Sequence, residues 1–540
     1  MTPTKTKSKH MRIRQTLAAV VAFVATALLI QSVRPIQSAA TSFDVMETSI
    51  AKVHQAYAAG QLSARQLAQM YLDRIEAYDK KGPTINSVIT INPDALSEAD
   101  RLDAAFKESG LVGPLHGIPV VLKDQMDVAG IRTTLGSLVF KDYVPTQDAF
   151  VVEKLKKAGA IILAKVTLGE LGGGDTYGSL FGETRNPYDL ERTVGGSSGG
   201  TGAAVSSNFA TIGIGQEGFA SIRRPSTWNS IVGMRPTAGL VSRSGVYAGW
   251  PSTNGSLGPM TRTVTDLATL LDVMVGYDPE DPVTAFGVGH APESYTDFLI
   301  EDGLKGARIG ILREPMGSDS EPDSQDFKNV TVMFDKAISD LKAAGAQVVD
   351  PIEIPDLNEL LAKRSSSTRD GGASTRMYLS RNPNSPYKTA DDIQSAPDYD
   401  KTFRRRRGSS GGGTSSGSRE NAHYEYLLAR EELMTNVMKV MADYQLDAIL
   451  HKSVEHTPTL IKDGINPPYV NHKGAPHLNT FLIYAASIAV PAGFTIDDLP
   501  VGITFFGRPY SEPTMIKLAY AYEQATRHRK VPPATPGLGK

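Results

Sequence analysis

Two serines and a lysine are the residues whose types and spacing suggest acyl transfer. Ser197 lies in Gly195-Gly-Ser-Ser-Gly-Gly200, Ser221 follows 24 positions later, and Lys123 stands near the end of the apolar run 117–124. Hydroxyls and an amine are sufficient for nucleophilic catalysis when a base activates the nucleophile. Glycines let the backbone approach a reacting group and direct N–H groups towards it.

Lys123 must lose its proton to serve as that base. An ammonium at the end of an apolar strand is partly removed from water, which disfavours its charged form; complete burial lowers a lysine pKa from ~10.4 to as little as ~5–6. Ser197 could then relay a proton from Ser221 to Lys123. The structural alternative is a flexible glycine turn, with Ser221 as a helix cap and Lys123 as a solvated strand end.

Other chemical motifs have less support. Gly196-Ser-Ser-Gly-Gly200 fits the G-x-S-x-G pattern of α/β-hydrolases, but residues 186–193 before it read as a loop rather than the strand that this motif requires. Ser49-Ile-Ala-Lys52 fits S-x-x-K, but the partner motifs S-D-N and K-T-G are missing, so it reads better as a helix face. No Lys-Ser/Thr follows the glycines, as a phosphate-binding loop would need.

The composition is that of a soluble globular protein. The chain has 540 residues, of which 41% are hydrophobic and 21% charged, enough for one large domain or several smaller ones. A net charge of −2 argues against nucleic-acid binding. Cysteine is absent and the ten histidines show no HExxH or paired spacing, so we expect neither thiol chemistry nor a metal site.

Residues 1–40 have the pattern of a secretory signal peptide. Basic residues precede the apolar run 17–30, and Ser38-Ala-Ala40 offers a cleavage site. This run is short for a membrane span, which needs ~20 residues. Cleavage would remove six basic residues and leave 50 against 58 acidic ones, a charge of −8. We therefore expect a secreted or periplasmic protein, with membrane attachment only if this segment stays as an uncleaved anchor.

The remaining sequence alternates between expected strands and helices. Ser63 and Gln66 form a capping-box pattern before a helix that ends at Gly82-Pro83. Further helices are expected at 94–108, 148–157, 325–343, 422–442 and 514–528. Strands are expected at 85–91, 118–122, 160–166, 307–312, 448–450 and 501–506. This alternation favours an α/β fold with a helix-covered sheet.

Residues 363–418 differ from the rest. They are rich in Ser, Arg, Gly and Asp and contain Arg404-Arg-Arg-Arg407 followed by a Gly/Ser stretch at 408–418. Such a composition buries little apolar surface, so we expect a flexible surface insert, with a substrate-facing lid or an anion-docking patch as the alternative. Helical sequence resumes after it, so residues 41–540 are expected to form a single domain.

Together these motifs resemble those of the amidase signature family of serine hydrolases, over roughly residues 63–529. The lysine strand at 117–124, the glycine–serine motif at 195–200 and the nucleophile motif at 221–225 carry the resemblance. Segments 233–239, 258–260, 491–494 and 499–502 are similar to other recurring segments of the family. The resemblance implies the amidase signature fold, an α/β fold whose twisted mixed central β-sheet is covered by helices on both sides, with the insert outside that core.

The resemblance also implies a role for each residue. Ser221 would be the nucleophile, Ser197 the bridging serine after a cis peptide bond, and Lys123 the final base, with no metal or organic cofactor. Ser198 would hold the cis-serine loop by hydrogen bonds, and backbone N–H groups just before Ser221 would form an oxyanion hole. The expected oxyanion and substrate-binding positions are Gly218, Phe219, Ala220 and Ser198.

The residues just before Ser221 depart from the family, which usually has small residues there. Phe219 cannot adopt a positive φ as cheaply as glycine. Either Gly218 takes the unusual turn, or the oxyanion hole is reshaped. A phenyl ring at this position favours apolar or aromatic acyl groups.

The expected function is an exported amidohydrolase that acts on a small-molecule amide as a monomer or homodimer. The same three residues could serve a carbamate, urethane or ester hydrolase. The resemblance also allows the amidating subunit of a tRNA-dependent amidotransferase, although the signal pattern argues against that cytoplasmic role. A catalytically silent binding protein is a third alternative, which the presence of all three side chains disfavours.

Overall fold

The computed structural model describes residues 43–249, 255–364, 371–406 and 416–539. The chain divides into a short N-terminal unit, Met1–Asp44, and a large unit, Val45–Lys540, and only the large unit is treated below. The predicted signal peptide at 1–40 lies outside the described residues. Among the described helices, none is both long and apolar enough to cross a membrane.

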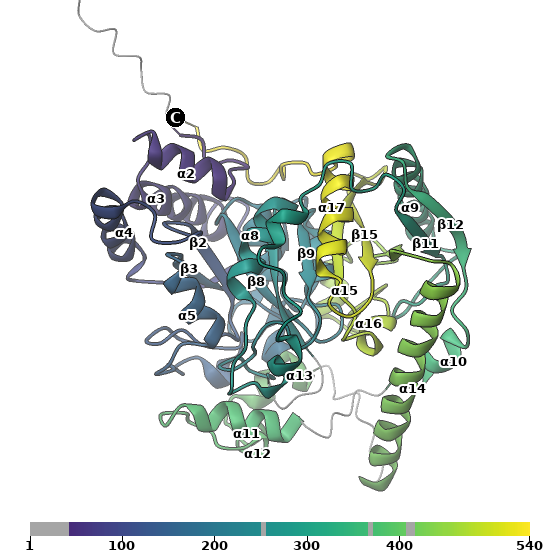
Figure 1. The fold of residues 1–540 in the computed structure, drawn as a ribbon. Helices are drawn as coiled ribbons and strands as arrows, with labels where there is room; N and C mark the ends of the chain where they lie inside the picture. Colours follow the sequence, from purple (N-terminus) through teal and green to yellow (C-terminus); the bar gives the residue numbers. More distant parts are fainter. Residues whose placement is uncertain (1–42, 250–254, 365–370, 407–415, 540) are drawn as a thin grey trace, which may run out of the picture. The chain divides into compact units, whose positions relative to one another are not determined.

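A mixed 11-stranded sheet runs through the large unit in the order β1-β3-β2-β8-β10-β9-β14-β15-β13-β11-β12 (Figure 1). β2 pairs in parallel with β3 and β8, and β11 pairs in parallel with β12 and β13, while the other pairs are antiparallel. The strands are β1 (Val88–Ile91), β2 (Pro119–Lys123), β3 (Ile161–Val166), β8 (Ile212–Glu217), β9 (Val232–Arg235), β10 (Ser256–Thr261), β11 (Arg308–Leu312), β12 (Gln347–Ile352), β13 (Ala448–Lys452), β14 (Ser487–Phe494) and β15 (Pro500–Phe506).

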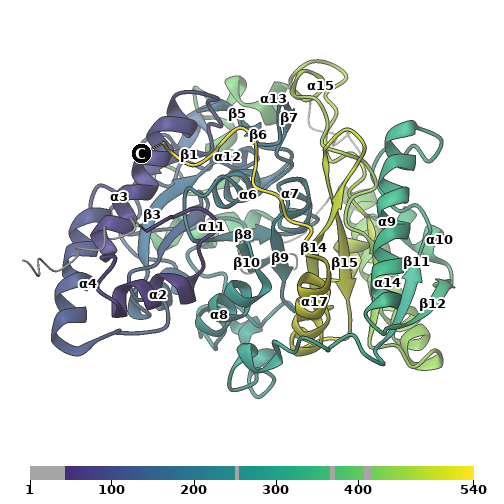
Figure 2. The same cartoon turned by 90° about the horizontal axis from the view of Figure 1, so that it is seen from above.

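Helices cover both faces of this sheet. Figure 2 shows α8 (Val264–Met274) and α17 (Glu512–Thr526) along one face, and α6 (Gly199–Ser206) and α7 (Arg223–Trp228) along the other. The remaining α-helices are α2 (Ile50–Ala58), α3 (Ala64–Arg74), α4 (Ala95–Ser109), α5 (Phe150–Lys157), α9 (Gln325–Ala343), α10 (Leu357–Ala362), α11 (Gly371–Arg381), α12 (Ala390–Gln394), α13 (Phe403–Arg406), α14 (Ser416–Asp443), α15 (Ile461–Ile465) and α16 (Leu478–Phe481). The predicted α/β architecture, a mixed central sheet covered by helices on both sides, is confirmed.

Most predicted elements lie within a few residues of the observed ones, and the prediction at 325–343 coincides with α9. Ser63 Oγ accepts the N–H of Gln66 at 3.2 Å and Gln66 Oε1 accepts the N–H of Ser63 at 2.8 Å, which confirms the capping box. That helix continues as a π-helix over Ile75–Lys80. Ser49 caps α2 by accepting the N–H of Lys52 at 3.3 Å, a structural role for the S-x-x-K pattern.

Two short hairpins precede the glycine–serine motif, one of β4 (Tyr177–Gly178) and β5 (Gly182–Glu183), the other of β6 (Arg185–Asn186) and β7 (Asp189–Thr193). The second hairpin occupies the segment predicted as a loop. Its strands form a separate two-stranded sheet. The buried central strand of an α/β-hydrolase elbow is therefore missing at this position among the described residues.

The structure differs from the flexible loop expected at 363–418, because residues 371–406 contain helices α11, α12 and α13. Tyr378, Leu379 and Ile393 are buried in a cluster with Leu135 and Phe140. The average hydrophobicity of the insert is low, so it gave no sign of these few apolar side chains. Their burial is what orders the segment. The stretches 365–370 and 407–415 of the insert lie outside the described residues.

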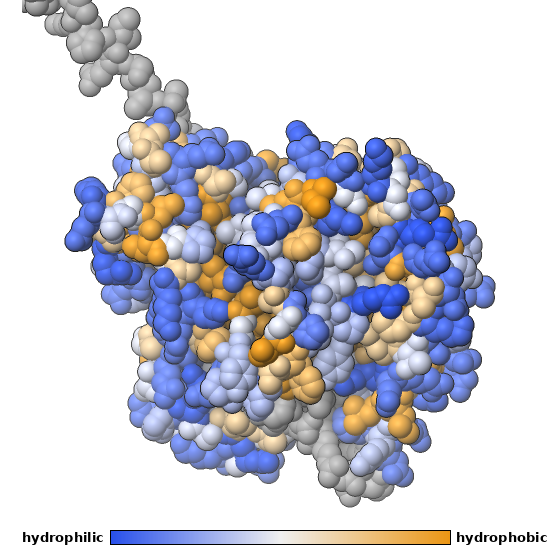
Figure 3. Space-filling view, in the orientation of Figure 1, coloured by the Kyte–Doolittle hydropathy of each residue, from blue (hydrophilic) through white to orange (hydrophobic). Residues whose placement is uncertain are grey.

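The space-filling view in Figure 3 shows a largely hydrophilic face, on which apolar side chains are scattered among charged ones. This surface agrees with the composition of a globular protein.

The sheet brings the three candidate residues towards one edge. β2 ends at Lys123, and its parallel neighbour β8 ends at Glu217, four residues before Ser221. Carboxyl ends of adjacent parallel strands meet at the same edge of a sheet, where ligands commonly bind. α6, which begins directly after the glycine–serine loop, packs on these two strands.

Candidate active site

Lys123 is fully buried at the end of β2. Its Nζ donates to Ser197 Oγ at 2.7 Å and to the carbonyl oxygen of Gln216 at 3.1 Å. Burial lowers the pKa of Lys123 well below its usual range, and the negative charge of Glu217 opposes this shift only in part. The amine is therefore held against the first serine in an environment that favours its neutral form.

Close backbone contacts hold the loop that carries Ser197. The Gly196–Ser197 peptide bond is cis, and Gly195 has a φ of +78°. A Cβ on Gly196 would lie 2.3 Å from the carbonyl oxygen of Gly174, so that only glycine fits there. The carbonyl of Ser197 accepts the N–H of Gly169 at 3.0 Å.

Ser198 connects this loop to β8 and to the segment of Ser221. Its Oγ donates to the carbonyl of Gln216 at 3.1 Å and accepts the N–H of Gln216 at 3.2 Å. Its own N–H donates to the carbonyl of Ser221 at 3.1 Å. The backbone of Ser221 is thereby tied to the residue after Ser197. Among the described residues, no hydrogen bond joins the side chains of Ser197 and Ser221.

The carboxylate of Glu217 braces the turn that carries Ser221. It accepts the N–H groups of Ile222 at 2.9 Å and Arg223 at 3.0 Å, and Arg223 Nε also donates to it at 2.9 Å. Burial alone raises the pKa of Glu217, but the charges of Arg223 and Arg235 outweigh it, so that the pKa lies below its usual value. The charged carboxylate fixes both ends of the segment 218–221.

Phe219 led us to expect either an unusual turn at Gly218 or a reshaped oxyanion hole. The first of these expectations is wrong. Neither Gly218 nor Phe219 has a positive φ, so the phenylalanine is accommodated without strain of that kind. A Cβ built on Gly218 meets no atom within 4 Å, so open space lies beside this part of the turn. Ala220 is buried, while Phe219 is half-buried.

Sequence reasoning missed two residues that shape the site. Glu217 could have been suspected, because an acid at the end of a strand and six positions before an arginine can pair with that arginine and accept N–H groups at the start of the next helix. Arg364 places its guanidinium 4.2 Å from the ring centroid of Phe219, and no local pattern links these two distant residues. In the part of the chain that the structure describes, no cluster of three His, Asp or Glu side chains could hold a metal ion.

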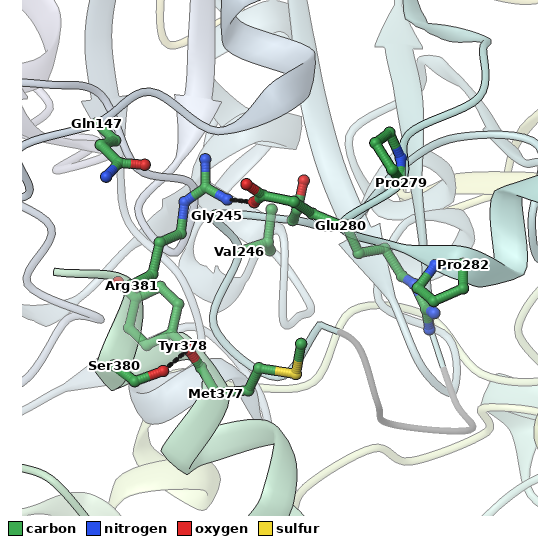
Figure 4. Close-up of a pocket in the computed structure, with 12 residues that line it drawn as sticks. Gln147, Gly245, Val246, Pro279, Glu280, Pro282, Met377, Tyr378, Ser380 and Arg381 are labelled. Carbon is green, nitrogen blue, oxygen red and sulfur yellow. Dashed lines mark hydrogen bonds and ion pairs between the residues drawn. The ribbon is translucent and has the colours of Figure 1, made fainter.

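A separate pocket of about 390 Å³ lies between the loops at 243–246 and 279–282 and α11 (Figure 4). Arg381 points across it towards Glu280, with which it forms an ion pair, and Tyr378 lies beside it. Tyr378 donates to Asp127 at 2.8 Å, while burial raises the pKa of Asp127 to about 6. This contact joins the insert to the segment after Lys123, although none of the three predicted catalytic residues lines the pocket.

The chain as a whole is similar to several known proteins. The family model named Amidase matches residues 66–516. The A subunit of the glutamyl-tRNA(Gln) amidotransferase of Symbiobacterium thermophilum is 33% identical over 503 residues, covering 90% of this chain and 98% of that protein. A probable amidase of Arabidopsis thaliana is 30% identical over 515 residues, covering 91% and 92%. The native peptide amidase from Stenotrophomonas maltophilia has a similar structure, with a TM-score of 0.75, 32% identity and coverage of 90% and 98%.

Proposed function

This chain belongs to the amidase signature family, and from that premise we propose that it hydrolyses the C–N bond of small carboxylic amides through Ser221, Ser197 and Lys123. The observation that carries the proposal is the buried Nζ of Lys123, 2.7 Å from Ser197 Oγ. A lysine with a depressed pKa in contact with a serine is the arrangement that activates a hydroxyl without histidine.

In the proposed reaction, Ser221 Oγ attacks the amide carbonyl carbon. Its proton passes to Ser197, whose own proton passes to the neutral amine of Lys123. The electron pair of the carbonyl moves to oxygen, and N–H groups of the segment 218–221 stabilise the resulting oxyanion. The Ser221–Ser197 hydrogen bond forms when substrate binds, since catalytic contacts often tighten only in the complex.

The proton on Lys123 then returns through Ser197 to the nitrogen of the substrate. The C–N bond breaks, the carbonyl reforms as an ester of Ser221, and ammonia or an amine leaves. Water attacks this ester and gives its proton to Lys123 by the same relay, which releases the carboxylic acid and restores Ser221. The atoms balance as one amide and one water converted to one acid and one amine.

A panel of purified substrates tests this proposal. We expect the chain without residues 1–40 to hydrolyse primary amides, anilides or peptide amides, and the Ser221→Ala variant to lose this activity while it keeps its fold by circular dichroism. Turnover confined to carbamates or esters would replace the amide assignment by one of the alternatives that use the same residues. Full activity of Ser221→Ala would refute the mechanism.

A second candidate, the amidating component of a glutamyl-tRNA(Gln) amidotransferase, is supported by the 33% identity to such a protein over 98% of its length. The two candidates differ in whether the isolated chain acts alone. Hydrolysis by the purified single chain favours the hydrolase, whereas activity that needs further subunits favours the second candidate.

We also propose export, which the signal pattern at 1–40 supports. Expression with and without these residues, followed by fractionation, tests it. Full-length protein should reach the periplasm or medium and the truncated chain should stay in the cytoplasm. Equal distribution of both forms would contradict export.

A further inference from the structure

A group of aromatic and basic side chains surrounds Phe219, two residues before Ser221. The guanidinium of Arg364 covers its ring at 4.2 Å, and the rings of His472 and His477 lie at centroid distances of 5.4 and 6.0 Å. We call these four side chains the Phe219 cluster. It lies beside the segment that carries the proposed nucleophile.

Arg364 has no acidic partner among the described residues, in contrast to other arginines of the same region. Arg223 is paired with Glu217, and Arg224 with Asp175, both in the segment that follows Ser221. Arg364 is half-buried, and this burial lowers its pKa. A guanidinium that is partly removed from water without a counter-charge is costly, and an anion at this place would offset the cost.

The other groups near Phe219 leave Arg364 as a positive centre. Burial and the charge of Arg364 lower the pKa of His477 to about 4, so this imidazole is neutral at neutral pH. Its Nε2 lies 2.9 Å from Ser318 Oγ. The nearby acid, Asp319, is exposed and makes no ion pair with Arg364 within the described part of the chain.

Space for a ligand lies next to this cluster. A Cβ built on Gly218 meets nothing within 4 Å, whereas a Cβ on Gly215, three residues earlier in β8, would lie 2.6 Å from Met260 Sδ and 2.9 Å from Ser198 Oγ. The packing is thus dense behind the serines and open beside Gly218. Gly218 directly precedes Phe219 in the chain, so this space is available to a substrate bound at Ser221.

We propose that Arg364 binds a carboxylate carried by the substrate, so that the enzyme prefers amides with an anionic group a few bonds from the reacting carbonyl. This inference rests on the hydrolase function proposed above and adds a substrate class to it. A guanidinium presents a planar pair of N–H donors that matches a carboxylate, and stacking on Phe219 holds that plane in place.

Binding to the full chain with Ser221→Ala tests the inference independently of turnover. Isothermal titration compares succinamate with butyramide, which differ by a carboxylate on the acyl side, and N-acetylglycinate with N-ethylacetamide, which differ by a carboxylate on the amine side. The pair that shows a preference identifies which part of the substrate faces Arg364.

We expect one carboxylate probe to bind at least ~10-fold more tightly than its neutral match, as a charged hydrogen bond would give. Adding Arg364→Gln should abolish this preference, and Arg364→Lys, which keeps the charge but not the planar fork, should retain part of it. The matched control is Lys530→Gln, which removes a cation from the ring of another phenylalanine, Phe494, at 4.4 Å, and should retain the whole preference.

Equal binding of charged and neutral probes, or a preference that survives Arg364→Gln, would overturn the inference. The hydrolase function and the role of Arg364 can be refuted independently of each other. If the chain with Ser221 intact hydrolyses amides but shows no preference for carboxylate probes, only the role of Arg364 is refuted. A preference that depends on Arg364 in a chain that hydrolyses nothing would support the anion site and refute the hydrolase.

Discussion

Arg223 Nε donates to Glu217 Oε1 at 2.9 Å, and both side chains are buried at the turn that carries Ser221. This contact joins the end of β8 to the start of α7, and the same carboxylate accepts two backbone N–H groups of that turn. The position of Ser221 therefore depends on the carboxylate of Glu217, which takes no part in the proposed reaction.

Replacing Glu217 by Gln should destabilise the protein by about 3–5 kcal/mol, because Arg223 and Arg235 would remain buried without their counter-charge. The variant should also lose activity, since the turn is no longer held. Urea unfolding measures the first effect. Glu183→Gln, at a half-exposed ion pair 3.7 Å from Arg185, is the control and should cost less than about 1 kcal/mol. Equal losses in the two variants would contradict the bracing role.

Gly196→Ala should destabilise the fold by about 1–3 kcal/mol or more, because its Cβ would overlap the carbonyl oxygen of Gly174. Gly218→Ala is the matched variant, in which the new methyl group meets only open space, and should change stability by less than about 0.5 kcal/mol. Thermal unfolding of both proteins checks this contrast. Similar melting temperatures would show that the glycine–serine loop has room for a methyl group at Gly196.

Lys123→Met should make stability depend less on pH. The folded pKa of Lys123 is depressed, so the unfolded chain binds one more proton than the folded chain between that pKa and ~10.4. Wild-type stability therefore rises with pH in this window, by about 1.4 kcal/mol per unit from this group.

The neutral methionine has no such dependence. Lys123→Met should be the more stable protein at pH 7, and its advantage should shrink towards pH 10. Unfolding free energies of both proteins at several pH values measure the difference. A constant difference across this range would mean that Lys123 keeps its proton when the protein folds.

Leu379→Ala should cost about 2–5 kcal/mol, because Leu379 is fully buried in the cluster that anchors the insert. Met377→Ala, at an exposed position two residues earlier, should change stability by less than about 0.5 kcal/mol. Hydrogen exchange in residues 371–406 checks whether the loss is local to the insert. Unchanged protection there would show that α11 is not held by this cluster.

The sequence could predict β1, β2, β3, β11, β13 and β15 and helices such as α9, because these elements follow from local pattern, but it did not predict β8, β9, β10, β12 or β14. The contact of Lys123 with Ser197 was expected from the chemistry of the two residues and from the family resemblance. The sequence could not predict the helices of the insert, because the average hydrophobicity of residues 363–418 is low and does not reveal the few apolar side chains, such as Leu379 and Ile393, that become buried. It also could not place Arg364 on Phe219, which are far apart in the chain and meet only through the fold.

The central claim is that the neutral amine of Lys123 activates Ser221 through Ser197. The rate at which a fluorophosphonate modifies the protein, with the modified residue identified by peptide mapping, tests it most directly. We predict that Ser221 is labelled, that the rate rises with pH through the lowered pKa of Lys123, and that Lys123→Met slows labelling by about 10²–10⁴-fold. Labelling of a different residue, or labelling of Ser221 in Lys123→Met at the wild-type rate, would contradict the account.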